Sequence, residues 1–211
     1  MTCIADDYAE VMPFFGRRTV VAELRGHGQS SAPSEGYDLA ALSGDVDAVV
    51  DDVTDGPVHI VTFSRGTSYA IAWALEHPDR VRSISIGDYV PEEKVLPEGA
   101  ARFLLDGRWR GTPVHERLNE PAALATFSAA RTRSFWEPLA QLQPPLLAVR
   151  GRNSGIVSDA DWARYRQLFP AAVLVVFDDS PHDIFRPDRD RYPRLVRELV
   201  DGYLTDRGRG R

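Results

Sequence analysis

Short apolar runs of strand length alternate with segments of helical periodicity along most of this chain. The strand-like runs lie at residues 19–24, 58–63, 81–86, 146–149 and 173–177, and the main helical patterns lie at 39–53, 68–77, 160–168 and 192–204. Strands that alternate with helices in this way form a parallel sheet with helices on its faces. The sequence therefore predicts an α/β fold with a mostly parallel sheet.

The alternation is interrupted once, by residues 91–143. This stretch contains several prolines and no clear strand, with helix-like segments at 100–105 and 121–130. About fifty residues exceed an ordinary connection in such folds, which is commonly ~2–6 residues long. We expect this insertion to form a small helical cap over a core made by residues 1–90 and 144–206, followed by a flexible tail at 207–211.

Composition excludes several functional classes. The chain has 211 residues and a formal net charge of −6, which suits one folded core and argues against nucleic acid as the main partner. Cys3 is the only cysteine, so an internal disulfide or a cysteine-rich metal site is excluded. No apolar run approaches the ~18 residues of a membrane helix. The first residues also lack the pattern of a signal peptide, so we expect a cytoplasmic protein without a membrane partner.

The strongest local motif joins the predicted strand at 58–63 to the next helix. Ser64 follows Phe63 directly, in a pattern close to G-x-S-x-G with Thr62 in place of the first glycine. Such a turn is crowded and requires small residues on either side of the serine. Gly66 meets this requirement, and Thr62 meets it less well. It exposes the serine hydroxyl at the carboxyl end of the sheet and directs the Arg65 N–H to where an oxyanion would form. The alternative is that Ser64 only caps the helix, and the motif alone does not decide.

A second signal follows the last predicted strand, in the sequence Asp-Asp-Ser-Pro-His-Asp that ends at Asp183. A histidine in this loop, His182, suits a general base that reaches across the sheet edge to Ser64. The alternative is an ordinary loop histidine. By contrast, His59 lies inside a predicted strand and His77 at a helix end, where structural roles are expected.

In this order the motifs resemble those of the α/β-hydrolase superfamily, over nearly the whole chain. Residues 23–30 (ELRGHGQS) resemble its D-x-R-G-x-G-x-S loop, residues 76–81 (EHPDRV) its helix-to-strand link, and residues 145–151 the strand before its usual acid loop. The resemblance implies a parallel sheet with a cap. It also implies Ser64 as the nucleophile, His182 as the triad histidine and the Arg65 N–H as one oxyanion donor.

The triad acid departs from the family pattern. The family carries an aspartate three or four residues after the glycine that ends its acid-bearing strand, and Ser154 and Gly155 hold those positions here. Neither can be ionised, so neither can stabilise an imidazolium. Asp159 comes later, but its surroundings indicate a capped helix start. We therefore name Asp88, after the strand at 81–86, because some family members place the acid there; the alternative is that Asp88 only stabilises the loop into the cap.

The N-terminus departs as well. In the family, a central strand and a His-Gly loop precede the helix that matches residues 6–15, and that loop supplies the second oxyanion N–H. Met1 falls near the oxyanion residue of this loop. A missing central strand would leave two neighbouring strands unpaired. Three explanations are open: a truncated reading frame, a sheet that closes the gap, or a second copy that fills the gap in a homodimer. We favour the truncated reading frame, which predicts marginal stability and weak activity.

The sequence thus predicts a serine hydrolase that acts on a small ester, amide or related acyl compound, with no metal or organic cofactor. Trp109, Phe135 and Trp136 in the cap are expected to line its acyl or alcohol pocket, the alternative being that they form the core of the cap. Two other functions fit the same fold. One is a non-catalytic binding protein, and the other is a lyase or cofactor-free peroxidase that uses the same Ser and His.

Overall fold

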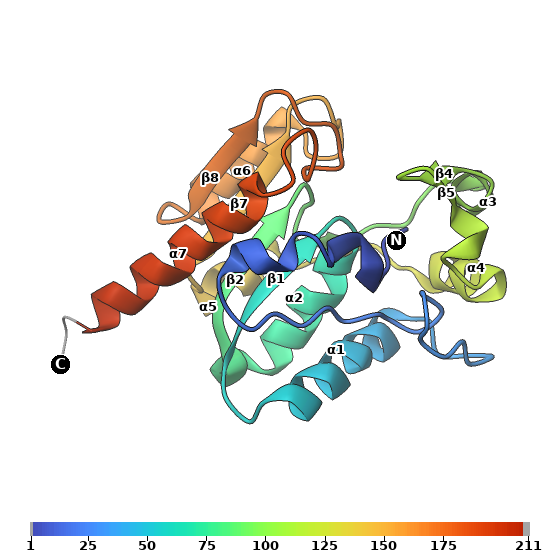
Figure 1. The fold of residues 1–211 in the computed structure, drawn as a ribbon, viewed down its shortest axis with the longest axis horizontal. Helices are drawn as coiled ribbons and strands as arrows, with labels where there is room; N and C mark the ends of the chain where they lie inside the picture. Colours follow the sequence, from blue (N-terminus) through green and yellow to red (C-terminus); the bar gives the residue numbers. More distant parts are fainter. Residues whose placement is uncertain (1, 209–211) are drawn as a thin grey trace.

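A parallel sheet lies at the centre of the protein, as Figure 1 shows for the computed structural model, which describes residues 2–208 and the side chains of residues 2–202. Its four strands have the order β1-β2-β7-β8. Their bounds are Val58–Phe63 (β1), Val81–Gly87 (β2), Leu146–Gly151 (β7) and Val173–Phe177 (β8). All three ladders are parallel, so the predicted α/β architecture is confirmed.

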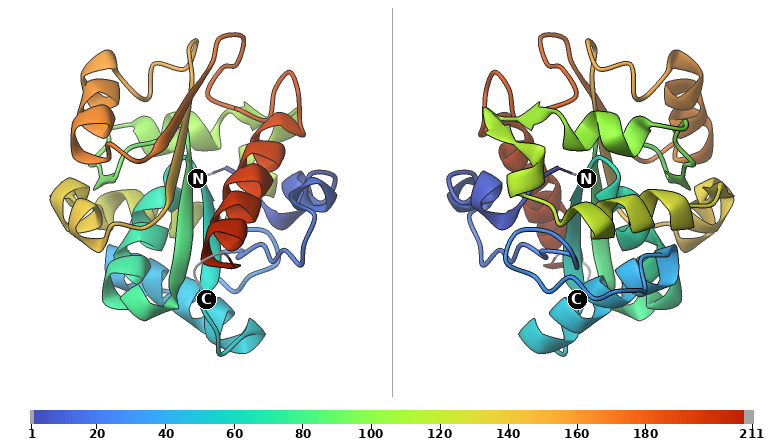
Figure 2. Two further views of the ribbon diagram at one scale, coloured as in Figure 1. Left: turned by 90° about the vertical axis from the view of Figure 1, so that its left-hand side faces the viewer. Right: turned by 90° about the vertical axis from the view of Figure 1, so that its right-hand side faces the viewer.

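Helices cover both faces of this sheet (Figure 2). One face carries α1 (Leu39–Val53), α2 (Gly66–Glu76), α5 (Trp136–Leu142) and α6 (Asp159–Leu168), and the other carries the short 3-10 helices η1 (Ala5–Tyr8) and η2 (Met12–Phe15) with α7 (Arg191–Gly208). Strand β7 shows why two cores form. Leu146 and Ala148 point into the first core, whereas Leu147 and Val149 point into the second, because successive side chains of a strand alternate between its faces.

The last helix, α7, is amphipathic. Its buried stripe contains Tyr192, Val196 and Val200, which repeat every four residues and pack on the second core. Its other face is rich in charged side chains and lies on the outside of the molecule. None of the helices within residues 2–208 combines the length and the apolarity that crossing a membrane requires.

The segment between β2 and β7 contains several small elements. These are β3 (Glu92–Glu93), α3 (Ala100–Leu105), β4 (Arg108–Trp109), β5 (Thr112–Pro113), η4 (Val114–Glu116), α4 (Glu120–Ala129) and β6 (Arg133–Ser134). The four short strands, absent from the sequence prediction, form two antiparallel ladders, β3 with β6 and β4 with β5. Leu105, Val114, Leu118 and Ala123 make a separate small core. The assignment of residues 91–143 to a cap stays a prediction, as does the tail, of which residues 209–211 lie outside the described part.

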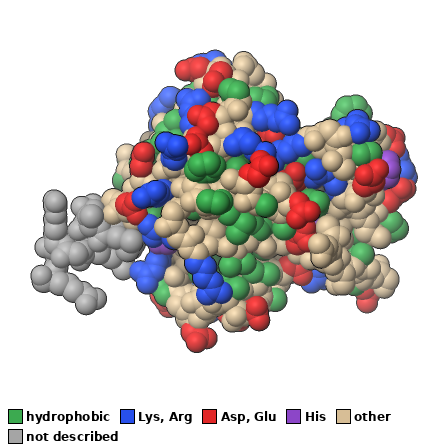
Figure 3. Space-filling model, viewed as in Figure 1, with side chains coloured by type: hydrophobic (Ala, Val, Ile, Leu, Met, Phe, Trp, Pro, Cys, Tyr) green, Lys and Arg blue, Asp and Glu red, His purple; other side chains and the backbone are tan. Residues whose placement is uncertain are grey.

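Residues 19–24 do not form the predicted strand. In the described sheet β1 has one ladder partner, β2, and no segment pairs with its other edge. A strand needs hydrogen bonds to a neighbour, so apolar, β-branched residues alone do not make one. Val20 and Val61 are 46% and 38% exposed. Figure 3 shows hydrophobic side chains at the surface of the face that carries η1, η2 and α7. In the described structure β1 is therefore an edge strand.

Burial of His59 on β1 is expected to make the fold sensitive to acid. The pKa of His59 is lowered to about 4, first by burial and then by the charges of Arg17 and Arg82, while its Nδ1 lies 2.8 Å from Ser83 Oγ. The unfolded chain, with a pKa of about 6.5, binds the proton more readily, so stability falls as the pH drops from about 6.5 towards 4. Because His59 is only half-buried, water screens part of this effect, and we expect His59 to account for about 1–2 kcal/mol of the loss.

Urea unfolding at pH 7 and pH 5 measures this effect, with His59→Gln as the comparison because glutamine does not titrate. The wild type should lose more stability than the variant between the two pH values. An equal loss in both proteins would contradict the role given to His59.

Candidate active site

Ser64 lies in a sharp turn between β1 and α2. Its φ is +57°, in the left-handed region that non-glycine residues rarely adopt, so the turn is strained. Two hydrogen bonds hold it: the Ser64 N–H donates to Gly87 O at 2.9 Å, and the Thr67 N–H donates to Ser64 O at 3.0 Å. The strand-turn-helix motif therefore places the serine hydroxyl at the carboxyl end of the sheet.

Thr62, at the position of the first motif glycine, is accommodated by hydrogen bonding. The Thr67 hydroxyl donates to Thr62 Oγ1 at 2.9 Å, and Thr62 Oγ1 donates to Ser85 O at 3.2 Å. At Gly66, in contrast, an added Cβ would meet no heavy atom within 4 Å outside its chain neighbours, so the crowding expected there is absent. Thr62 therefore makes two buried hydrogen bonds, which connect the turn of Ser64 to β2 and α2.

His182 bridges Ser64 and Asp88. Its Nε2 lies 2.8 Å from Ser64 Oγ, and its Nδ1 lies 2.6 Å from Asp88 Oδ2. A carboxylate at Nδ1 keeps a proton on that nitrogen, which leaves Nε2 to accept the serine proton. The structure thus brings together the three residues that the sequence analysis named as a triad, in the order that general-base activation of a hydroxyl requires.

The carboxylate of Asp88 is fully buried, at 0% exposure, and three donors surround it. The Gly151 N–H donates to Oδ1 at 2.9 Å, and the Ser154 hydroxyl donates to Oδ2, the oxygen that also faces His182. The main chain of Asp88 is anchored too, because its N–H donates to Val149 O at 2.7 Å. A buried charge is costly unless it is hydrogen-bonded, and these contacts supply the compensation.

A glycine lets the loop of His182 approach the end of β7. A Cβ on Gly151 would lie 2.3 Å from Pro181 O and 2.7 Å from Ser180 O, distances that no side chain tolerates. The Asn153 N–H donates to Ser180 O at 3.2 Å and joins the two loops. This close approach carries His182 towards Asp88 and explains why the strand before the acid loop ends in glycine.

Aromatic rings adjoin the histidine. The ring of Phe63 stacks on His182, with centroids 5.0 Å apart and planes 29° from parallel, and Trp109 of β4 lies next, 6.3 Å from Phe63. Trp109, one of the three predicted pocket residues, is therefore separated from His182 by the ring of Phe63. Its contact with a substrate stays a prediction.

The prediction for Phe135 and Trp136 is wrong. Both are buried in the main core, Trp136 completely. The indole N–H of Trp136 donates to Glu92 Oε1 at 2.7 Å, and its ring meets that of Tyr165 edge-on at 4.6 Å. The reason is that α5 packs against α2 and α6, so these aromatic side chains fill the protein interior instead of a pocket.

Arg65 follows the nucleophile at the start of α2. Its side chain is buried, with Nε donating to the Tyr69 hydroxyl at 3.0 Å and Nη1 to Lys94 O at 2.9 Å, and its guanidinium lies 5.4 Å from the centre of the Phe127 ring. Among the hydrogen bonds recorded for residues 2–208, none uses the Arg65 backbone N–H. Nothing in the sequence signals these contacts of the Arg65 side chain.

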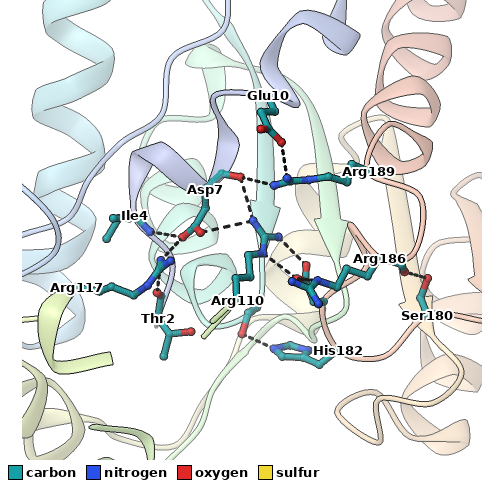
Figure 4. Close-up of polar contacts among 12 residues, drawn as sticks. Thr2, Ile4, Asp7, Glu10, Arg110, Arg117, Ser180, His182, Arg186 and Arg189 are labelled. Atoms are coloured by element: carbon teal, nitrogen blue, oxygen red, sulfur yellow. Dashed lines mark hydrogen bonds and ion pairs between the residues drawn. The ribbon is translucent and has the colours of Figure 1, made fainter. Parts of the chain in front are cut away.

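An ion-pair network beside His182 was not predicted. Arg110, at the turn between β4 and β5, donates from Nε and Nη2 to the Asp183 carboxylate at 2.8 and 2.7 Å and from Nη1 to Asp7 O at 2.9 Å (Figure 4). Arg117 donates to Asp7 Oδ2 at 2.6 Å. Arg110, Arg117 and Asp7 line a cavity of about 810 Å³. The network joins the hairpin to the residue that follows His182.

A smaller cavity of about 110 Å³ adjoins the turn of Ser64. Phe63 and Gly66 line it on the side of the turn, and Tyr8 and Leu24 line it on the side of the N-terminal segment. It separates residues 21–24 from the end of β1, consistent with the missing strand pairing there.

Comparison with known proteins agrees with this geometry. A profile described as alpha/beta hydrolase fold matches residues 3–89. The non-heme chloroperoxidase of Streptomyces lividans is 35% identical over 225 aligned residues, covering 84% of this chain and 80% of that protein. The chain belongs to the α/β-hydrolase family. It is also 25% identical to the 2-(acetamidomethylene)succinate hydrolase of Mesorhizobium japonicum, covering 87% of this chain and 78% of that protein.

Solved structures show the same α/β-hydrolase fold. The crystal structure of an E-2-(acetamidomethylene)succinate hydrolase matches with a TM-score of 0.67 at 21% identity, covering 85% of this chain and 80% of the other. An esterase from Exiguobacterium antarcticum matches with a TM-score of 0.64 at 16% identity, covering 86% and 80%. The predicted family and fold are therefore confirmed, and the relatives of this α/β-hydrolase include hydrolases and esterases.

Proposed function

We propose that this α/β-hydrolase is a serine hydrolase of a small ester, amide or related acyl compound. The observation that carries the proposal is the hydrogen-bonded series from Ser64 through His182 to Asp88, with distances of 2.8 and 2.6 Å. A serine hydroxyl without a neighbouring base is a weak nucleophile. A histidine that accepts its proton, and that is held by a carboxylate, activates it.

In the proposed reaction, Ser64 Oγ attacks the substrate carbonyl carbon while His182 Nε2 takes the hydroxyl proton. The negative charge that forms on the carbonyl oxygen is stabilised by the N–H of Arg65, next to the α2 N-terminus. Collapse of the intermediate expels the alcohol or amine, which receives the proton from His182. A water molecule, deprotonated by His182, then hydrolyses the acyl-serine, and Asp88 stabilises the imidazolium in both steps.

The names of relatives support hydrolysis as the reaction class. Besides the 2-(acetamidomethylene)succinate hydrolase, a 2-hydroxymuconate semialdehyde hydrolase of Pseudomonas putida is 24% identical, covering 87% of this chain. A peroxidase is the second candidate, because the 35% identical relative is named a non-heme chloroperoxidase. Halogenation of a phenol with hydrogen peroxide and halide, measured beside ester hydrolysis, distinguishes the two.

A fluorophosphonate probe, which reacts with activated serines, tests the role of Ser64. We expect the wild type to be labelled and Ser64→Ala not to be, with the hydrolysis of p-nitrophenyl acetate lowered at least about 1000-fold. Ser134→Ala is the matched control, because Ser134 is an exposed serine on β6 and its loss should leave labelling unchanged. Folded wild-type protein that takes no label, or a Ser64→Ala variant that still does, would exclude the proposal.

A further inference from the structure

We propose that Ser154 is a positioning residue of this triad, whose hydroxyl holds the Asp88 carboxylate against His182. The inference rests on the proposed function, because it assigns a role within the same site. Ser154 occupies a position where the family resemblance places the acid itself, and the structure puts its side chain on the carboxylate that stands in for that acid.

The contact lies on the oxygen that matters for the base. Ser154 Oγ is hydrogen-bonded to Asp88 Oδ2, which is also the oxygen 2.6 Å from His182 Nδ1. The other oxygen, Oδ1, is held by the Gly151 N–H at 2.9 Å. With one donor on each oxygen besides the imidazole, the carboxylate plane is fixed, and Oδ2 stays directed at His182.

The direction of the Ser154 hydrogen bond follows from its other partner. The Ile156 N–H donates to Ser154 Oγ at 3.0 Å, so one lone pair of this oxygen is occupied. An ionised carboxylate only accepts hydrogen bonds, so the hydroxyl proton points to Asp88. The loop holds Ser154 in place, because its own N–H donates to Gly151 O at 3.2 Å.

Loss of this donor frees the carboxylate in a fully buried site. With the Gly151 N–H and the imidazole as its remaining partners, the carboxylate gains freedom to rotate away from His182 Nδ1, and the Asp88–His182 hydrogen bond weakens. An imidazole that is held less firmly is a poorer general base. Removing Ser154 should therefore lower kcat and weaken the hydrogen bond between His182 Nδ1 and Asp88.

Other ionisable groups near the pair do not take over the role of Ser154 at the Asp88 carboxylate. Asp183, next to His182, is bound by Arg110 and lies 3.4 Å from Arg186 Nε, and none of these three touches Ser154. Tyr165 is close enough for the charge of Asp88 to act on it, but burial raises the pKa of its phenol well above the ordinary value and keeps it neutral.

The test compares Ser154→Ala with Ser154→Thr, which retains the hydroxyl, and with Ser158→Ala. Ser158 is a matched control, since it accepts from the Asp161 N–H at 3.1 Å and donates to Asp161 Oδ2 at 2.7 Å in the same loop but does not contact Asp88. It therefore reports what the loss of a loop-capping serine costs without any effect on the triad.

For Ser154→Ala we expect kcat for p-nitrophenyl acetate to fall about tenfold with KM unchanged, because the residue acts through Asp88 and does not touch the substrate. The downfield proton resonance of His182 Nδ1–H, which reports the hydrogen bond to Asp88, should move upfield in the NMR spectrum. Ser154→Thr should stay close to the wild type, and Ser158→Ala should lose stability without either change.

An unchanged kcat and an unchanged Nδ1–H resonance in Ser154→Ala would overturn the inference, as would equal changes in Ser158→Ala. The resonance does not depend on turnover. If the wild type neither hydrolyses esters nor takes the fluorophosphonate label, but the His182 Nδ1–H resonance still moves in Ser154→Ala alone, the proposed function fails and the role of Ser154 stands.

Discussion

Asp88→Asn is expected to lower kcat by about 10⁴-fold, the loss seen when a triad aspartate becomes an amide. The amide keeps the shape of the side chain but removes its charge. Its NH₂ group donates, so it favours the histidine tautomer with the proton on Nε2, which no longer accepts the proton of Ser64. KM should change little, because Asp88 is fully buried behind His182. Steady-state hydrolysis of p-nitrophenyl acetate measures both constants.

Asp159→Asn is the control for this prediction, because Asp159 is the other carboxylate near the usual acid position. Its side chain is 95% exposed in the first turn of α6 and pairs with Arg150 at 2.8 Å, so its loss should leave kcat unchanged. The double variant Asp88→Asn, Ser154→Asp should recover part of the activity, since it returns a carboxylate to the same pocket. A greater loss in Asp159→Asn than in Asp88→Asn would show that the acid was assigned to the wrong residue.

Arg110→Met is expected to lower the free energy of unfolding by about 3–5 kcal/mol, the cost of removing one partner of a buried ion pair. The side chains of Arg110, Asp183 and Asp7 are 9%, 8% and 5% exposed, so the variant leaves carboxylates with little water to solvate them. Methionine fills much of the same volume, which confines the effect to the lost charge and hydrogen bonds. Urea unfolding at neutral pH measures the change.

Arg102→Met supplies the comparison for Arg110. Arg102 pairs with Glu120 at the surface, where the two side chains are 52% and 46% exposed, and such pairs contribute about 0–1 kcal/mol. In the double variant Arg110→Met, Asp183→Asn, stability should be partly regained, because the unpaired carboxylate is gone. If Arg110→Met unfolds within about 1 kcal/mol of the wild type, the network does not stabilise the fold in the way that its burial indicates.

Local patterns predicted most of the elements, because helices and buried strands leave their periodicity in the sequence. Helix α1 has the bounds that its apolar spacing indicated, and the cap before α6 forms with Ser158 and Asp161 as expected. The strand predicted at residues 19–24 does not form, and the reason is physical. Their composition favours a strand, but strand formation depends on a neighbour at the correct edge, and a single segment carries no information about its partner.

In the candidate site, too, the residues that lie in local motifs could be predicted, and the contacts between distant residues could not. Ser64 and His182 lie in motifs that are continuous in the sequence, and Asp88 was named because the usual acid position could not be ionised. At positions 135 and 136 the sequence shows large apolar side chains. It does not show whether Phe135 and Trp136 line a pocket or pack in a core. The bond of Arg110 to Asp183 joins residues 73 positions apart and has no local pattern at all.

The attachment of Asp88 has a consequence for the lifetime of the site. Its N–H is bonded to Val149 and its carboxylate to the amide of Gly151, so β2 and β7 hold the acid by main-chain contacts at the end of their own ladder. Such ladders open only with the cooperative unit to which they belong. Amide exchange at Gly151 therefore reports the same opening event that releases Asp88, and the geometry of the proposed triad persists for as long as the sheet does.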